Sequence, residues 1–230
     1  MKVDVLQKLQ AARTAFLPVA LATRLADGNQ CLVINGESSG DLILEPPALE
    51  GILQCIRTDS SGHIDGGIFA RIYNAPLRLV LVGAVHIAQA LAPIARCAGF
   101  RVTVIDPRTA FATSERFPDV DLCTDWPDAA LNNIRIDSRT AVVTLTHDPK
   151  LDDTALLAAV RSDAFYIGAL GSSRTHAQRL TRLRQAGATE PELARIHAPV
   201  GIPLGGRRPA EVAVSIIAGI ISLLHAGAAG

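Results

Sequence analysis

The chain has 230 residues, enough for one large domain or two modest ones that bury a hydrophobic core. Hydrophobic residues make up 49% of it and aromatic residues only 4%, a composition that favours an α/β protein over an all-β one. Its 22 basic and 22 acidic residues balance. This balance argues against a nucleic-acid partner and against an acidic membrane surface, because both need a basic face.

The cysteines indicate a reducing compartment. Cys31, Cys55, Cys97 and Cys123 lie far apart and match neither a CxxC pair nor a zinc-ligand spacing, so we expect reduced, mostly buried thiols and no metal site. The amino terminus is charged where a signal peptide would be apolar. The longest apolar stretch, Val212 to Leu224, is shorter than the about 20 residues of a membrane-spanning helix. We therefore expect a soluble cytoplasmic protein with no membrane insertion.

Residues 1–75 are predicted to form a small α+β domain. Apolar side chains recur at helical spacing in residues 1–16. Four β-like runs at 18–25, 30–34, 41–44 and 68–73 follow, with hairpin turns at Asp27-Gly28 and Asn35-Gly36, a short helix at 49–57, and loops at 60–62 and 65–67. The junction Asn74-Ala75-Pro76 is the predicted boundary, because the residue before a proline is pushed out of helical geometry.

After this boundary, apolar strands alternate with helices. Strands are predicted at 77–82, 101–105, 141–146 and 164–167, and helices at 86–98, 152–161, 175–186 and 209–224; the segment between the second and third strands is predicted to be a loop containing Pro107, Pro118 and Pro127. Nearly all-apolar strands are typical of a parallel sheet covered on both faces. We expect residues 76–230 to form a doubly wound parallel sheet that binds ligands at the carboxyl ends of its strands.

The turn after the first of these strands partly matches the dinucleotide fingerprint. Gly83 fits the first glycine, and Asp106, 23 positions later, stands where an acid would meet a ribose hydroxyl. Arg108 would suit a ribose 2′-phosphate instead. Val85 replaces the middle glycine and obstructs the approach of a pyrophosphate. Nucleotide binding by these residues and a plain strand–helix turn are both open, and His86 faces either a ligand or solvent.

Thr146-His147-Asp148 ends the strand predicted at 141–146. A His–Asp pair exposed at this edge can do acid–base work or hold a ligand hydroxyl, so His147 and Asp148 are the candidate catalytic residues. In the alternative, Asp148 or Asp152 caps the following helix and His147 only packs beside it.

Two later loops are candidates for anion binding. The first comprises Gly168, Gly171, Ser172, Ser173 and Arg174, which precede a helix and offer free N–H groups, the helix dipole and a guanidinium. Its alternative is an ordinary serine-capped helix whose arginines, Arg179 and Arg182 among them, form a solvated face. The second runs from Pro199 to Glu211, where Gly205 permits unusual dihedrals and Arg207 adds positive charge; it is either a ligand lid or a connector with solvated arginines.

Seven motifs occur in order over residues 78–222: GAVHIA, VTVIDPR, the FP-D-WP stretch, LTHDPKLDD, FYIGALGSSRTHAQRL, ARIHAPVGIPLGG and PAEVAVSI. Together they resemble the XdhC/CoxI family, the accessory factors of xanthine dehydrogenase-type and carbon monoxide dehydrogenase-type molybdenum hydroxylases. The resemblance implies a Rossmann domain behind a smaller amino-terminal domain. It also implies a cofactor-binding chaperone, rather than a turnover enzyme, that binds molybdenum cofactor (molybdopterin) and assists its sulfuration and insertion. The implied partners are an apo molybdenum hydroxylase and a cysteine desulfurase.

The chain departs from the family pattern and looks like a short, divergent member. Family members usually have Gly-Ala-Gly-His where this chain has Gly-Ala-Val-His at 83–86. Residues 17–75 lack the Gly-Gly-Cys-Val/Leu-Glu motif of longer members, so neither Cys31 nor Cys55 is assigned to cofactor handling. Pro203 and Arg208 stand where many relatives have an acidic residue and a capping Ser or Thr.

Other readings of the sequence stay open. The chain could be an NAD(P)-dependent oxidoreductase with His147 or His86 as proton donor, or a ligand-free interaction module with a Rossmann fold. The Ala- and Ile-rich last helix is either a homodimer surface or core.

Overall fold

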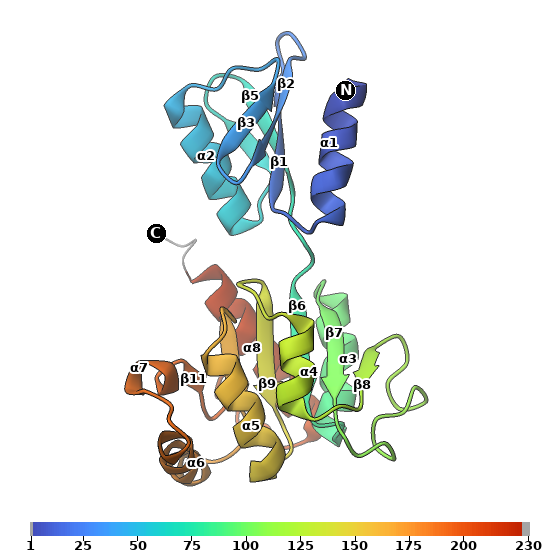
Figure 1. Ribbon diagram of the computed structural model, residues 1–230, viewed down its shortest axis with the longest axis vertical. Coiled ribbons are helices and arrows are strands. Elements are labelled where there is room, and N and C mark those ends of the chain that lie inside the picture. Colours follow the sequence, from blue (N-terminus) through green and yellow to red (C-terminus); the bar gives the residue numbers. More distant parts are fainter. Residues whose placement is uncertain (1, 227–230) are drawn as a thin grey trace. The chain divides into compact units, whose positions relative to one another are not determined.

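The computed structural model describes residues 2–226. Met1, in the first predicted helix, and residues 227–230, at the end of the second predicted domain, lie outside the described residues. The chain divides into two units, Met1–Ala75 and Pro76–Gly230, each with its own sheet (Figure 1).

The amino-terminal unit is an antiparallel sheet with the strand order β3-β2-β1-β5-β4. Its elements are α1 (Val3–Thr14), β1 (Val19–Arg24), β2 (Gln30–Ile34), β3 (Glu37–Gly40), α2 (Pro46–Thr58), β4 (Gly62–Ile64) and β5 (Ile68–Tyr73). Successive side chains of a strand point to opposite faces. Val19 and Leu21 of β1 therefore share a core with α1, whereas Ala20 and Ala22 share one with α2.

The prediction of a strand at 41–44 is wrong, because the third strand is β3, which ends at Gly40. Asn35 and Gly36 have φ values of 51° and 85°, the left-handed geometry of a two-residue hairpin turn, so the returning strand starts at the next residue. Glu37 accordingly pairs with Ile34. Leu42 has left the sheet and is buried in the core beneath α2. β4 likewise begins inside a segment that was predicted to be a loop.

The carboxyl-terminal unit is a parallel sheet of six strands in the order β11-β10-β9-β6-β7-β8. Its strands are β6 (Arg78–Val82), β7 (Arg101–Ile105), β8 (Asp121–Cys123), β9 (Thr140–Thr144), β10 (Tyr166–Ala169) and β11 (Ile196–His197). Its helices are α3 (His86–Cys97), α4 (Pro127–Ile134), α5 (Pro149–Val160), α6 (Ser173–Gln185), α7 (Glu190–Leu193) and α8 (Pro209–His225). If the six strands are numbered 1 to 6 along the chain, their order across the sheet is 3-2-1-4-5-6, as in dinucleotide-binding folds. The switch point lies between β6 and β9.

Helices cover both faces of this sheet, which confirms the predicted doubly wound α/β class (Figure 1). One core joins Leu81 of β6 to Leu91 of α3 and Ile216 of α8. The other joins Val80 of β6 to Leu156 of α5, and also includes side chains of α4 and α6. Because each helix starts where a parallel strand ends, the amino termini of α3, α5 and α6 lie along the same edge of the sheet.

The loop predicted between β7 and β9 is wrong over two stretches, which form β8 and α4. Pro127 is the first residue of α4, where a helix needs no N–H donor, so this proline starts a helix instead of marking a loop. β8 has only three residues and pairs with β7 from Thr103–Asp121 onward. Because β8 is so short and begins with the polar Asp121, its sequence shows no run of apolar residues from which a strand can be predicted.

α8 supplies core as well as surface. Ala213, Ile216, Ile217 and Ile220 are buried in the core shared with α3, whereas Val214 is 45% exposed. The apolar composition of α8 is thus largely explained by packing within the unit. No helix in residues 2–226 combines the length and hydrophobicity needed to cross a bilayer.

Candidate functional site

Apart from Gly168, the predicted site residues lie in turns or loops at the carboxyl ends of strands. We call the turns at residues 83–86, 106–108, 146–148 and 170–174 the carboxyl edge; they follow β6, β7, β9 and β10. A parallel sheet places all such turns along one side. Contacts between turns show this directly, since Thr146 closely approaches Gly83, and Asp148 is close enough to Arg108 to raise its pKa.

The turn after β6 is held from both sides. Gly83 has φ +112°, and a Cβ there would lie 2.5 Å from the Thr146 Cγ2 atom, so only glycine fits. The Gly83 N–H donates to the Ile105 carbonyl at 2.8 Å. Val85 is half-buried and packs on the α3–α8 core, whereas the side chain of His86 is exposed at the first residue of α3.

Asp106 is fully buried and already has partners on both carboxylate oxygens. The Ala84 N–H donates to Oδ2 at 2.8 Å, and Arg108 donates from its backbone N–H and Nε to Oδ1 and from Nη2 to Oδ2 at 2.7–3.0 Å. Burial acts to raise the pKa of Asp106, but the Arg108 and Ala84 hydrogen bonds outweigh it and hold that pKa below its ordinary value. A ribose hydroxyl would reach this carboxylate only if Arg108 moved aside.

Arg108 is the exposed half of this pair. Its side chain is 41% exposed, and its guanidinium carbon lies 4.8 Å from the centre of the Phe111 ring, within the range of a cation–π contact. The hydrogen bond to Asp106 raises the pKa of Arg108, and so do the negative charges of Asp148 and Asp152. Arg108 therefore remains a cation at the carboxyl edge.

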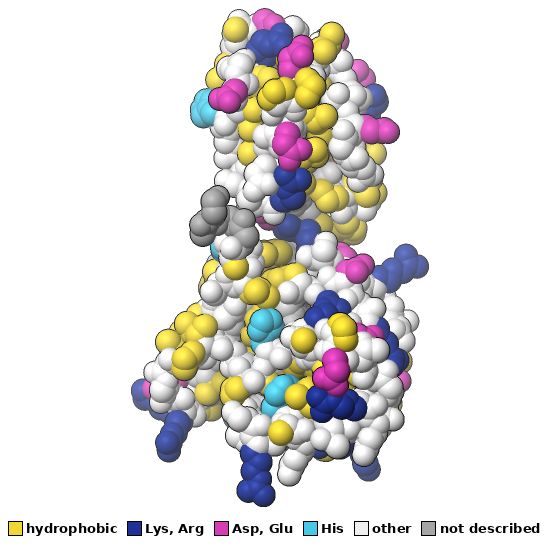
Figure 2. Space-filling model, turned by 90° about the vertical axis from the view of Figure 1, so that its left-hand side faces the viewer, with side chains coloured by type: hydrophobic (Ala, Val, Ile, Leu, Met, Phe, Trp, Pro, Cys, Tyr) yellow, Lys and Arg dark blue, Asp and Glu magenta, His cyan; other side chains and the backbone are white. Residues whose placement is uncertain are grey.

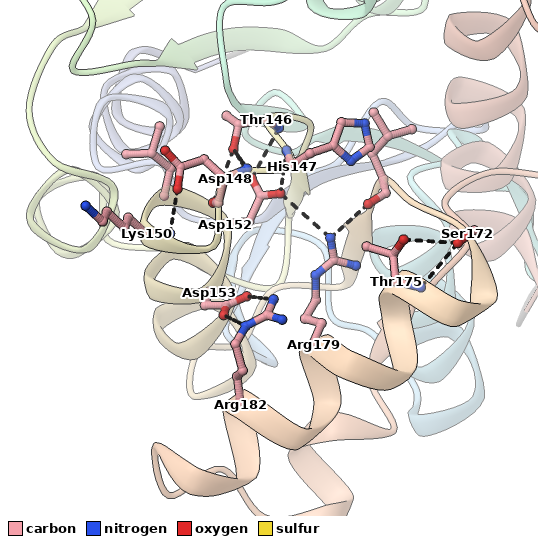
Figure 3. Close-up of polar contacts among 12 residues, drawn as sticks. Thr146, His147, Asp148, Lys150, Asp152, Asp153, Ser172, Thr175, Arg179 and Arg182 are labelled. Atoms are coloured by element: carbon pink, nitrogen blue, oxygen red, sulfur yellow. Dashed lines mark hydrogen bonds and ion pairs between the residues drawn. The ribbon is translucent and has the colours of Figure 1, made fainter.

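The turn after β9 is built on the buried carboxylate of Asp152 (Figure 3). Its Oδ1 accepts from the Thr146 N–H at 3.2 Å and from Thr146 Oγ1 at 2.7 Å, and its Oδ2 accepts from the His147 N–H at 3.0 Å. These bonds hold His147 at φ +64°, a left-handed conformation that is uncommon outside glycine. The exposed imidazole is thereby presented at the carboxyl edge.

Asp148 serves the helix that follows. Its Oδ1 accepts from the Lys150 N–H at 3.0 Å as the N-cap of α5, one of the two alternatives that the sequence left open. No hydrogen bond joins its carboxylate to the His147 imidazole in the described chain. The two residues are neighbours at the edge, and their catalytic role stays a prediction.

The turn after β10 leads into α6 through a serine cap. Ser172 Oγ accepts from the Thr175 N–H at 3.2 Å (Figure 3), and Gly171 has φ +139°. Within residues 2–226, the N–H groups of Ser173 and Arg174 have no hydrogen-bond acceptor, and both side chains are exposed. Free N–H groups at the positive end of a helix are suited to an anion.

Gly168 lies inside β10 and not in the turn. A Cβ there would lie 2.5 Å from Val200 Cγ2 and 2.8 Å from Tyr166 Cε1. The missing side chain therefore makes room for packing between β10 and the segment that follows β11, and contact between Gly168 and a ligand stays a prediction.

Arg179 is the functional-site residue that the sequence did not place in the site. The alternative in which Arg179 and Arg182 form a solvated face of α6 is wrong for Arg179, because its side chain is only 2% exposed. Its Nη2 donates to the Leu170 carbonyl at 2.8 Å and lies 3.7 Å from Asp152 Oδ2 (Figure 3). Helical spacing could have predicted that Arg179 is buried, because it is four residues before the buried Leu183 and so lies on the same face of α6. Arg182, by contrast, is 38% exposed and pairs with Asp153.

Burial disfavours the charged forms of both Asp152 and Arg179. Arg179 Nε and Nη1 are buried and have no hydrogen-bond partner among the described residues. Burial raises the pKa of Asp152 despite the hydrogen bonds from Thr146 and His147, and it lowers the pKa of Arg179 despite the nearby negative charge of Asp152. The hydrogen bond to the Leu170 carbonyl places the Arg179 guanidinium beneath the turn after β10.

The loop after β11 packs on α8. Gly201 has φ +88°, and a Cβ there would lie 2.4 Å from Ser215 Oγ. Gly205, at φ +75°, has open space around it. Arg207 has an exposed side chain, and its N–H donates to Glu211 Oε2 at 2.9 Å. Together this loop and α8 line an open cavity of about 430 Å³, bordered on one side by Leu170.

Charged side chains and thiols also lie outside the carboxyl edge. On the face drawn in Figure 2, Lys and Arg side chains are interspersed with Asp and Glu. The described residues hold no cluster of three or more His, Cys, Asp or Glu side chains that could bind a metal ion. The expectation of mostly buried thiols is wrong, because only Cys31 is buried and Cys97 is exposed. Burial raises the pKa of Cys31 to about 11.

Comparison with known proteins gives a consistent result. Residues 79–220 match the family model of the XdhC Rossmann domain. A Bacillus subtilis (strain 168) protein, named as a probable xanthine dehydrogenase subunit, is 34% identical over 176 residues, covering 75% of this chain and 51% of that protein. The molybdenum cofactor insertion chaperone PaoD of Escherichia coli (strain K12) is 33% identical over 182 residues, covering 79% of this chain and 50% of PaoD.

A solved structure is similar over almost the whole chain. The crystal structure of a Bacillus halodurans protein described as a xanthine dehydrogenase aligns with a TM-score of 0.75 and 25% identity, covering 96% of this chain and 66% of that one. The present chain spans about half the length of the Bacillus subtilis protein and of PaoD.

Proposed function

Since this chain belongs to the family of the XdhC Rossmann domain, we propose that it is a maturation factor for a molybdenum hydroxylase, one that binds molybdenum cofactor at the carboxyl edge and delivers it to the apo-enzyme. PaoD, which is similar over 79% of this chain, is named as a molybdenum cofactor insertion chaperone. The cytoplasm is the proposed compartment.

The observation that carries the proposal is the gathering of anion-binding groups at one edge of the parallel sheet. The free N–H groups of Ser173 and Arg174 and the guanidinium of Arg174 suit a phosphate monoester such as that of molybdopterin. Arg108 adds a second cation near the switch point. The exposed imidazole of His147 lies between these groups along the sheet, and can hold or transfer a proton at the ligand.

The bound cofactor would supply the molybdenum centre that the hydroxylase uses, and the chain's own residues would hold it until transfer. For sulfuration we assign the sulfur donor to a separate partner, a cysteine desulfurase. Cys31 is poorly suited to carry sulfur, because its thiol is buried and its pKa is raised to about 11, which keeps it protonated at neutral pH.

Gel filtration with cofactor released from a purified molybdenum hydroxylase tests the proposal. We expect the cofactor to elute with this protein at micromolar concentration, and Arg174→Ala to weaken the retention. Arg101→Ala is the matched control, since this exposed arginine begins β7 at the opposite edge of the sheet. Free elution of the cofactor from the wild-type protein would contradict the proposal.

The oxidoreductase alternative is less well supported, because Arg108 and Ala84 already occupy both oxygens of Asp106. Calorimetry with NADH and NADPH separates the two functions, and heat from either nucleotide without cofactor retention would favour the oxidoreductase. If stable His147→Ala and Arg174→Ala variants still mature the hydroxylase in cells, an interaction module without ligand becomes the better description.

A further inference from the structure

The cavity beside α8 has the size and lining of a small-molecule site. Its volume is about 430 Å³, and small-molecule sites typically measure about 300–1,000 Å³. Leu170, Ile202, Leu204 and Val212 give it apolar walls, and Glu211 is the charged residue of its lining; the Glu211 carboxylate already accepts hydrogen bonds from Arg207 and Arg208. Such walls are suited to the faces of a flat ring system.

The wall formed by the loop is fixed in place before any ligand arrives. A Cβ on Gly201 would collide with the backbone and side chain of Ser215, and one on Gly219 would lie 2.9 Å from the Gly201 Cα atom. Ser215 Oγ donates to the Ile202 carbonyl, and the Ile202 N–H donates to the Ser215 carbonyl at 3.2 Å. A preformed wall lowers the entropy lost when a ligand binds.

Leu170 connects this cavity to the turn that precedes α6. Its side chain lines the cavity, and the next residues are Gly171 and the Ser172 cap. Its carbonyl accepts from Arg179, a buried guanidinium whose Nε and Nη1 have no partner in the described chain. An apolar cavity therefore adjoins a helix amino terminus that has a buried cation behind it.

We propose that this cavity holds the ring system of a flat fused heterocycle whose phosphate monoester binds at the amino terminus of α6. The inference rests on the proposed function and adds the position of the ring. The ring lies on the β10 side of the switch point, between α8 and the loop after β11 (residues 199–206). A ligand bound there needs one phosphate and one ring system. It does not use Asp106, the position at which the ribose of a dinucleotide would bind.

Filling the cavity tests the inference. Val212→Trp places an indole in the cavity from the first turn of α8, whereas Val214→Trp, on the same helix, is a matched control whose side chain is 45% exposed and does not line the cavity. The probe is 6-hydroxymethylpterin phosphate, followed by its fluorescence. We expect Val212→Trp to weaken binding by about tenfold or more and Val214→Trp to leave it unchanged.

Two further measurements keep the outcomes distinct. Leu204→Trp fills the cavity from the exposed loop, where it does not disturb the core, and should weaken binding in the same way. Inorganic phosphate should compete with the probe. If the cavity variants bind the probe like wild type, the inference fails while the proposed function stands. If the wild-type protein binds neither the probe nor released molybdenum cofactor, the proposed function fails.

Discussion

Two buried carboxylates stand near the carboxyl edge of the parallel sheet, each beside an arginine, and the two pairs are built differently. Asp106 is paired with Arg108, whose side chain is 41% exposed, whereas Asp152 is paired with Arg179, whose side chain is 2% exposed. The pKa of Asp106 is lowered and that of Asp152 is raised. The balance at each carboxylate decides the difference: the hydrogen bonds from Arg108 and Ala84 outweigh the burial of Asp106, whereas the burial of Asp152 outweighs its hydrogen bonds and the charge of Arg179, which lies 3.7 Å away.

The two pairs therefore have different roles. Arg108 covers Asp106 from the surface, so a ligand would reach this carboxylate only by displacing Arg108. Arg179 joins two turns of the edge, since it donates to the Leu170 carbonyl while its partner Asp152 holds the backbone of His147. The first pair controls access to a carboxylate, and the second positions the groups around the proposed ligand.

Breaking the buried pair should have the largest effect on stability. We expect Arg179→Ala to lower the free energy of unfolding by about 3–5 kcal/mol, because it leaves the Asp152 carboxylate buried without its cation. Urea denaturation followed by circular dichroism measures this. The double variant Arg179→Met with Asp152→Asn removes both charges and keeps an acceptor, so it should recover part of the loss. Additive losses in the double variant would mean that the pairing is not the cause.

Removing Asp106 should have a smaller effect. Asp106→Ala leaves the Ala84 N–H without its acceptor in a buried site, which we expect to lower the free energy of unfolding by about 1–3 kcal/mol. The same urea titration applies. A loss as large as that of Arg179→Ala would show that the two pairs do not differ as described.

The opposite pKa shifts predict opposite responses to acid. Asp106 has a lowered pKa, so its contribution to stability is present above the unfolded pKa of about 3.9 and is lost as pH falls through the lower folded value. Asp152 has a raised pKa, so its contribution is present below about pH 3.9 and is lost as pH rises through the folded value. Urea titrations of Asp106→Asn and Asp152→Asn across this range should diverge from wild type in opposite directions; parallel curves would contradict the assignment.

Removing the exposed arginine should have the smallest effect. We expect Arg108→Ala to change the free energy of unfolding by about 0–1 kcal/mol, because its guanidinium is partly exposed and the Ala84 and residue-108 backbone N–H groups still donate to Asp106. This variant also uncovers Asp106. If calorimetry then detects NADH binding that the wild-type protein lacks, Arg108 is what keeps a dinucleotide out, and the site is a nucleotide site that has been closed.

Local patterns accounted for much of the fold. The apolar runs that became β6, β7 and β9 and the helices α3 and α8 were predicted nearly where they lie, because each spans several residues with a consistent period. The short strand β8 and the helix α4 were missed, since three residues show no period and Pro127 was interpreted as a loop residue. The left-handed turn at Asn35 and Gly36 also determines where β3 begins, although the strand was predicted further along the chain, at 41–44.

The sequence by itself determined which residues stand at strand ends, and hence that Gly83, His147 and Ser172 share one edge of a parallel sheet. Only the tertiary structure decided that Asp106 is covered by Arg108, that Arg179 is buried against Asp152, and that the loop after β11 closes a cavity on α8. The physical reason is range: a helix or strand is encoded by neighbours a few positions apart, whereas Asp152 and Arg179 meet only because β9 and β10 lie side by side.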